Sequence, residues 1–95
     1  MKDQTLAIHA GFKADPETIR LETGPFGELL ALEVKSKERF VRELLSGLLA
    51  IGDLEGLARR ILVYRGSREL VTGEGIEVWP IQRFLQALEG DDLWP

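Results

Sequence analysis

A carboxylate and an ammonium stand two residues apart at the end of one apolar segment of the chain. The apolar residues 29–32 are followed directly by Glu33, Val34 and Lys35. In a β-strand alternate side chains share a face, so Glu33 and Lys35 point to one side and Val34 to the other. A carboxylate beside an ammonium can hold a metal ion and activate water, and charges on a buried strand need partners. This triplet is therefore the first candidate for a chemical site.

Further acids reach this site if the preceding segment pairs with it as a hairpin. Residues 17–22 have the pattern of a strand, and residues 23–27 contain the Gly and Pro of a turn. A hairpin that closes on these five residues predicts the pairs Glu22 with Glu28, Leu21 with Leu29, Ile19 with Ala31, Glu17 with Glu33, and Asp15 with Lys35. One face of the hairpin then carries three acids and one lysine. A shift of one residue would move Glu17 to the other face, so the site depends on the turn.

The order of these features resembles a known family. An acidic residue on one hairpin strand, Glu-x-Lys on the next strand and a following helix are similar to the PD-(D/E)xK nuclease superfamily, which has the restriction-endonuclease-like fold. The chain looks most like one branch, the nuclease-like C-terminal domain of prokaryotic AAA-type ATPases. This similarity covers roughly residues 17–90 and includes the segments 30–35, 60–66 and 75–80.

The resemblance implies a metal-dependent hydrolytic site that acts on nucleic acid. In such a site Glu33 binds Mg²⁺ together with Glu17 or Asp15, and Lys35 positions or helps to deprotonate the attacking water. The family places an aspartate in the preceding strand, whereas residues 19–22 of this chain contain none. This departure leaves a second interpretation open, a catalytically inactive module of the same fold that contacts a protein partner or an ATPase domain.

Composition predicts one globular domain over residues 1–95. The chain has 44% apolar and 29% charged residues, no cysteine and a formal net charge of −4. The acidic balance argues against tight, non-specific binding of nucleic acid. The N-terminus lacks a signal-peptide pattern, and no apolar segment approaches the roughly 20 residues that span a bilayer. We therefore expect a cytoplasmic protein with no membrane segment.

Two amphipathic helices are expected to cover the sheet. Ser36 predicts the cap of a first helix that begins at Lys37 and ends near Gly52. Pro80 suits the first turn of a second helix that ends at Gly90. The inward residues of the first helix are predicted to be Phe40, Val41, Leu44, Leu45, Leu48 and Leu49, and those of the second to be Ile81, Phe84, Leu85 and Leu88.

The expected fold is α/β, a small mixed sheet of about five strands with two main helices. Beyond the hairpin, strands are predicted over 5–8, 60–66, 69–71 and 76–79, and residues 91–95 are expected to form a flexible tail. The predicted core consists of Leu30, Leu32, Val34, Leu44, Leu45, Leu48, Ile61, Val63, Phe84 and Leu85. A sheet this small has exposed edges that a second copy could cover, so we expect a homo-oligomer.

Overall fold

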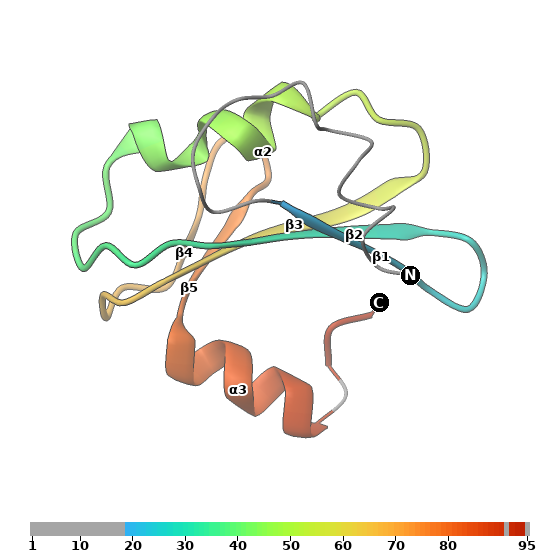
Figure 1. Ribbon diagram of the computed structural model, residues 1–95. Coiled ribbons are helices and arrows are strands. Elements are labelled where there is room, and N and C mark those ends of the chain that lie inside the picture. Colours follow the sequence, from blue (N-terminus) through green and yellow to red (C-terminus); the bar gives the residue numbers. More distant parts are fainter. Residues whose placement is uncertain (1–18, 91, 95) are drawn as a thin grey trace.

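The computed structural model describes residues 19–90 and 92–94, and these contain one mixed sheet (Figure 1). Its five strands lie in the order β1-β2-β3-β5-β4. The outer pairs β1–β2 and β4–β5 are antiparallel, and the inner pairs β2–β3 and β3–β5 are parallel. The strands are β1 (Arg20–Thr23), β2 (Leu29–Val34), β3 (Leu57–Tyr64), β4 (Leu70–Val71) and β5 (Glu77–Pro80). The predicted strand over 5–8 lies outside the described residues.

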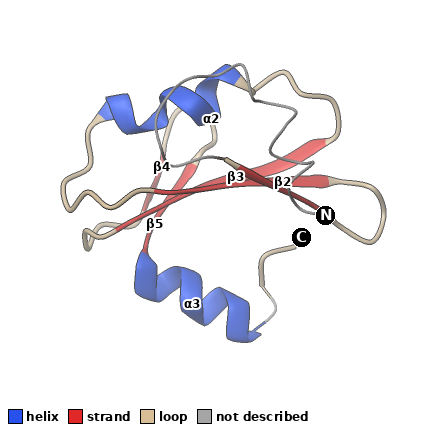
Figure 2. Ribbon diagram, in the orientation of Figure 1, coloured by secondary structure: helices blue, strands red, loops and turns tan. Residues whose placement is uncertain are grey.

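Helices cover both faces of the sheet (Figure 2). A 3₁₀ turn, η1 (Arg42–Leu45), runs into α2 (Ser46–Ala50), and this layer connects β2 to the parallel strand β3 across one face. On the opposite face lies α3 (Ile81–Gly90), which follows β5 directly. The expected small α/β fold with a mixed sheet and two helices is confirmed.

The alternation of the strands divides the core into two clusters. The cluster under η1 and α2 includes Leu21, Ala31, Leu45, Leu48 and Leu62. The cluster under α3 contains Leu30, Leu32, Ile61, Val63, Trp79 and Ala87. Most of the predicted core is confirmed, but Val34 and Leu85 are about half exposed and Phe84 is only partly buried.

The first helix begins later than predicted. Lys35 N–H donates to Val63 O (2.8 Å) and Arg65 N–H donates to Lys37 O (2.9 Å), so the chain runs on beside β3 after β2 has ended. Backbone groups engaged in this pairing cannot also form the first turn of a helix. The prediction of a helix start at Lys37 capped by Ser36 is therefore wrong. Helical structure begins at Arg42, after an extended Val41.

The turn of the hairpin is also shorter than predicted, with three residues in place of five. Gly24 N–H donates to Glu28 O (2.8 Å), and Gly27 has the left-handed φ of 85° that suits the last position of a three-residue turn. Leu21 therefore pairs with Ala31 rather than with Leu29, a shift of two residues from the predicted register. Because two residues is one full alternation of a strand, the shift leaves every side chain on its predicted face.

The end of the chain packs against the domain. Leu93 and Trp94 contact the cluster under α3, and Asp92 N–H donates to Ala87 O (2.8 Å). Of the predicted flexible tail 91–95, residues 92–94 are thus held by packing and hydrogen bonds. The remaining two positions lie outside the described residues.

Candidate functional site

Glu33 and Lys35 form a buried ion pair where β2 ends. The Lys35 ammonium lies 3.1 Å from Glu33 Oε2. Both side chains project toward the η1–α2 layer, because Glu33 pairs with Leu62 of β3 and shares the face of Ala31. The two residues are 1% and 5% exposed, respectively. The predicted shared face is confirmed, and the pair is almost completely shielded from solvent.

A glycine of α2 brings the helix backbone close to this pair. A Cβ atom at Gly47 would lie 3.2 Å from Glu33 Oε1 and 3.1 Å from Ile19 Cδ1. Gly47 is itself buried. The absence of a side chain at this position allows α2 to pack directly over the carboxylate. Ile19, which directly precedes β1, and Glu33 of β2 therefore approach the same point.

The acids predicted to complete a metal site are not part of the described chain. Glu17 and Asp15 lie outside the described residues, so their place in a metal site stays a prediction. The register that set Glu17 opposite Glu33 is wrong over the described residues, where Arg20 pairs with Leu32 and Leu21 with Ala31. Among residues 19–90 and 92–94, no group of three Asp, Glu, His or Cys side chains could hold a metal ion. The described residues bring one carboxylate to this place, and Lys35 offsets its charge. By themselves they do not fit Mg²⁺, which needs oxygen ligands on several sides.

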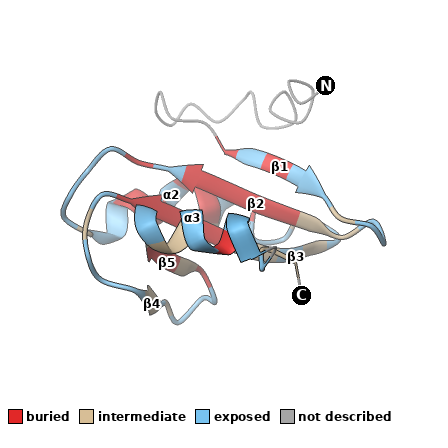
Figure 3. Cartoon of the chain, turned by 90° about the horizontal axis from the view of Figure 1, so that it is seen from below, coloured by how far each residue is buried: buried red, intermediate tan, exposed pale blue. Residues whose placement is uncertain are grey.

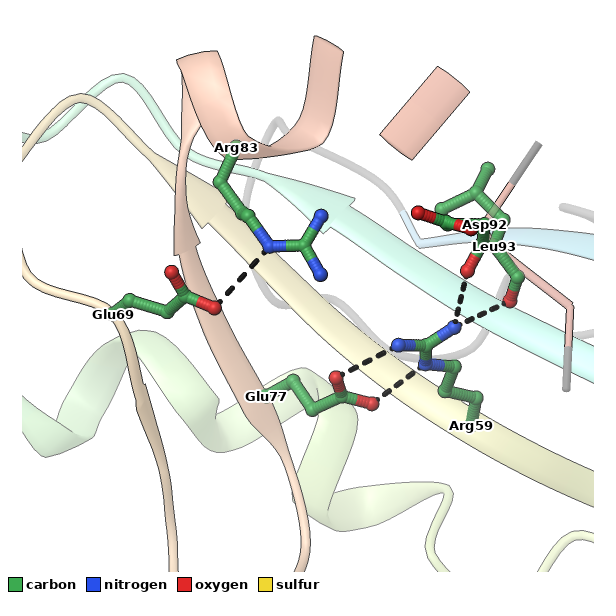
Figure 4. Close-up of polar contacts among 6 residues, drawn as sticks. All are labelled: Arg59, Glu69, Glu77, Arg83, Asp92 and Leu93. Carbon is green, nitrogen blue, oxygen red and sulfur yellow. Dashed lines mark hydrogen bonds and ion pairs between the residues drawn. The ribbon is translucent and has the colours of Figure 1, made fainter. Parts of the chain in front are cut away.

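A second polar cluster lies on the other face of the sheet (Figure 4). Arg59 of β3 donates two hydrogen bonds to Glu77 of β5, from Nε to Oε2 at 2.7 Å and from Nη2 to Oε1 at 3.0 Å. Its Nη1 donates to the carbonyl oxygens of Asp92 (2.9 Å) and Leu93 (2.7 Å). The hydrogen bonds to Glu77 raise the pKa of Arg59. This cluster, which we call the Arg59 clamp, fastens the C-terminal residues to the sheet.

Two arginines lie over the indole of Trp79 at this clamp. The guanidinium carbon of Arg59 is 5.3 Å from the ring centroid and that of Arg83 is 4.1 Å away. Arg83 Nε also lies 3.2 Å from Glu69 Oε2. Sequence reasoning missed this cluster because its members come from β3, β5, α3 and the tail. The available signal was the alternation of Arg59 with Ile61 and Val63, which predicts one shared strand face.

An exposed ion pair links the start of η1 to the turn before β5. Arg42 Nη2 lies 2.7 Å from Glu74 Oε2, and Nη1 lies 3.4 Å from Oε1. The hydrogen bond from Arg42, together with smaller contributions from a backbone hydrogen bond and from Thr72, lowers the pKa of Glu74 from 4.5 to about 2. This pair tethers the η1–α2 layer to the turn between β4 and β5, at one edge of the sheet.

Chemically, the two clusters differ in what they offer. The Glu33–Lys35 pair holds its charges against each other and away from water, which suits a structural role. The Arg59 clamp uses most of its donors on Glu77 and on the tail carbonyls.

None of the described helices has the length and apolar character required to span a membrane. Comparison of the chain with protein-family models, curated proteins and solved structures gave no match in any of the three.

Proposed function

We propose that this chain is a nuclease-like domain of the PD-(D/E)xK type in which the Glu33–Lys35 pair supports structure and contacts rather than cleavage. The observation that carries this proposal is the burial of both charged groups in a 3.1 Å ion pair. A phosphodiester and its attacking water need access to the groups that act on them. Side chains that are 1% and 5% exposed do not offer this access.

The order of elements supports the nuclease-like type. A hairpin, a strand that ends in Glu-x-Lys, a helical crossover and a parallel strand follow one another in the chain. This order is the one on which the resemblance rests. The side chain that lies beside Glu33 at Gly47 is the apolar Ile19, which directly precedes β1, where a two-carboxylate site would need an acid. An apolar side chain at this place supports the non-cleaving interpretation.

A second candidate is metal-dependent hydrolysis of nucleic acid by the same residues. The observation that favours it is the position of the pair at the carboxyl end of a parallel strand, where open α/β sheets bind ligands. In this candidate Glu33 with Glu17 or Asp15 would hold Mg²⁺, which supplies charge stabilisation for a phosphate. Lys35 would position the attacking water or help to deprotonate it.

The non-cleaving domain would act through protein contacts. The resemblance points to an ATPase domain as one partner, in the cytoplasm of a prokaryotic cell. Such a role needs the fold and its surface but no metal. It therefore predicts that the domain tolerates replacement of Glu33 and Lys35 together by uncharged side chains that preserve packing.

Thermal unfolding with and without Mg²⁺ or Mn²⁺ tests the proposal. A ligand that binds only the folded state raises the melting temperature, so a site that holds the ion would give a metal-dependent rise. We expect no such rise for the natural chain or for Glu33→Gln. Glu22→Gln is the matched control, since Glu22 is an exposed acid on the neighbouring strand. A rise that Glu33→Gln abolishes and Glu22→Gln keeps would support the hydrolytic candidate instead.

A cleavage assay then separates the two candidates directly. Single-stranded DNA, duplex DNA and RNA are incubated with the chain and Mn²⁺ at a protein concentration well above that of the substrate. We expect no cleavage above that of a heat-inactivated sample. Metal-dependent cleavage that disappears in both Glu33→Gln and Lys35→Ala would overturn the non-cleaving proposal.

A further inference from the structure

The two ends of the sheet carry opposite charge. Residues 36–41 and 65–69 lie at the carboxyl ends of β2 and β3, and they contain four Lys or Arg and two Glu. Residues 24–28 and 51–56 lie at the other end, and they contain three acids and no Lys or Arg. Figure 1 shows these two pairs of loops at opposite ends of the molecule. We call them the basic end and the acidic end.

Each end is built as one surface from two separate loops. At the basic end, Arg65 N–H donates to Lys37 O (2.9 Å). At the acidic end, Leu29 N–H donates to Gly56 O (2.9 Å), which brings the hairpin turn beside the loop before β3. The charges of each pair of loops are therefore held together by backbone hydrogen bonds.

Much of this charge is not neutralised by the residues that the structure describes. Among the described residues, Lys37, Arg39 and Arg68 at the basic end take part in no ion pair. The same is true of Asp53 and Glu55 at the acidic end. Unneutralised charge of opposite sign on two surfaces of one molecule favours attraction between copies.

The apolar groups at the two ends are complementary as well. Phe26 stands at the tip of the acidic end and is 91% exposed. Its N–H donates to Glu28 Oε1 (2.9 Å), which fixes the turn that presents the ring. The basic end has a surface hollow of about 530 Å³ whose lining combines two cations and one acid with two aliphatic side chains. It is lined by Ser36, Lys37, Glu38, Arg39, Val41 and Leu44.

We propose that this chain assembles head to tail, with the acidic end of one copy bound to the basic end of the next. The Phe26 ring fills the hollow beside Val41 and Leu44, and the acids of its end face Lys37, Arg39 and Arg68. Each copy uses a different surface at its two contacts, so the assembly grows into a ring or a filament. This inference concerns the exposed surfaces at the two ends of the sheet rather than the buried Glu33–Lys35 pair, and it goes beyond the proposed function.

A nucleic-acid strand fits the basic end less well than a second copy does. Binding of single strands combines cations with exposed aromatic rings that stack on the bases. The aromatic side chain in the basic loops is Phe40, and it packs edge-on against the buried Tyr64 with centroids 6.3 Å apart. The basic end therefore offers cations and aliphatic surface, which match an acidic turn with an apolar tip.

Sedimentation velocity across a range of concentrations, at about 0.05 M and about 0.5 M salt, tests the assembly. Because charges on surfaces are screened at high ionic strength, we expect masses above the monomer at low salt and a shift toward the monomer at high salt. Phe26→Ser should remove the assembly at both salt concentrations. The matched control is Val71→Ser, which removes an exposed apolar side chain from β4 and should leave the assembly unchanged.

A charge exchange identifies the two surfaces. Lys37→Glu with Arg39→Glu makes both ends acidic, and Asp53→Lys with Glu55→Lys makes both ends basic. We expect each double variant to be monomeric alone, and the two to associate when mixed, because a native acidic end then meets a native basic end. Circular dichroism of each variant establishes that it is folded.

Three outcomes would overturn this inference. A natural chain that is monomeric at every concentration is one, and a failure of the mixed variants to associate is another. The third is a salt-independent dimer that Leu85→Ser removes and Phe26→Ser keeps, which would assign association to the exposed side chains of α3. None of these results depends on metal binding or cleavage, so they leave the proposed function to its own tests.

Discussion

The two helical layers of this domain have similar sequence patterns and very different burial. Leu44, Leu45 and Leu48 of the η1–α2 layer are all buried. On α3, Leu85 and Leu88 are half exposed, and the buried position of the helix is Ala87 (Figure 3). The spacing of apolar residues thus predicted the inward side of the η1–α2 layer. For α3 it predicted the wrong side, because Ile81, Leu85 and Leu88 are all 44–50% exposed.

The ion pairs on the two faces of the sheet also differ in how deeply they are buried. The Glu33–Lys35 pair lies on the face of the η1–α2 layer and is buried. The Arg59–Glu77 pair lies on the face of α3, and about a fifth of each side chain is exposed. A buried ion pair depends on both partners, since removal of one leaves the other charge in a medium of low polarity. A partly exposed pair loses less when it is broken, because water replaces the missing partner.

The largest expected effect comes from breaking the buried pair. Lys35→Met removes the ammonium 3.1 Å from the Glu33 carboxylate and should lower the free energy of unfolding by about 3–5 kcal/mol. Replacing both partners, as Glu33→Gln with Lys35→Met, should recover most of this loss. Chemical denaturation of the natural chain, of Lys35→Met and of the double variant measures the loss and its recovery.

Arg20→Met provides the control for this comparison. Arg20 and Glu22 have the same i, i+2 spacing and lie 3.2 Å apart on β1, but both side chains are about half exposed. We expect a loss of less than about 1 kcal/mol. Equal losses for Lys35→Met and Arg20→Met would show that burial does not set the strength of these pairs.

The second prediction compares one leucine from each layer. Leu45→Ala should cost about 2–5 kcal/mol, because it leaves a cavity in a fully buried position. Leu85→Ala should cost less than about 1 kcal/mol, because half of that side chain is already exposed. Urea denaturation of both variants measures the difference. Similar losses of unfolding free energy at the two positions would mean that the Leu85 side chain is buried in solution.

The third prediction tests whether the Arg59 clamp holds the tail. Arg59→Ala removes the hydrogen bonds to Glu77 and to the carbonyls of Asp92 and Leu93, and it should cost about 2 kcal/mol. Arg59→Lys keeps the charge but not the planar fork, so it should recover only part of the loss. Carboxypeptidase digestion should remove the tail faster in Arg59→Ala. Unchanged digestion would show that packing of Leu93 and Trp94 is sufficient.

The smallest expected effect concerns the exposed Arg42–Glu74 pair, which tethers the η1–α2 layer. Folding lowers the pKa of Glu74 from 4.5 to about 2, so its contribution is present above pH 4.5 and is lost as the pH falls toward 2. The melting temperature of Arg42→Gln should therefore lie below that of the natural chain at pH 6 and approach it near pH 2. A difference that stays constant over this range would exclude the ion pair as its cause.

Much of this fold follows from local features of the sequence. Alternation placed Glu33 and Lys35 on one face of β2, because adjacent side chains of a strand must point to opposite sides. Gly24, Pro25 and Gly27 predicted a hairpin turn, and Pro80 and Gly90 predicted the bounds of α3. These features depend on neighbouring residues in the chain, and local sterics and hydrogen bonding are sufficient to predict them.

Other features depend on contacts between distant parts of the chain. The first helix starts at Arg42 because residues 35–37 continue along β3, and that contact is invisible in the local pattern. The Arg59 clamp joins residues up to 34 positions apart. The ion pair beneath Gly47 is closed because packing of the η1–α2 layer excludes water from it. Residue types fix which charges can meet, whereas their burial, and so their energy and chemical use, depends on the layers that the whole chain places over them.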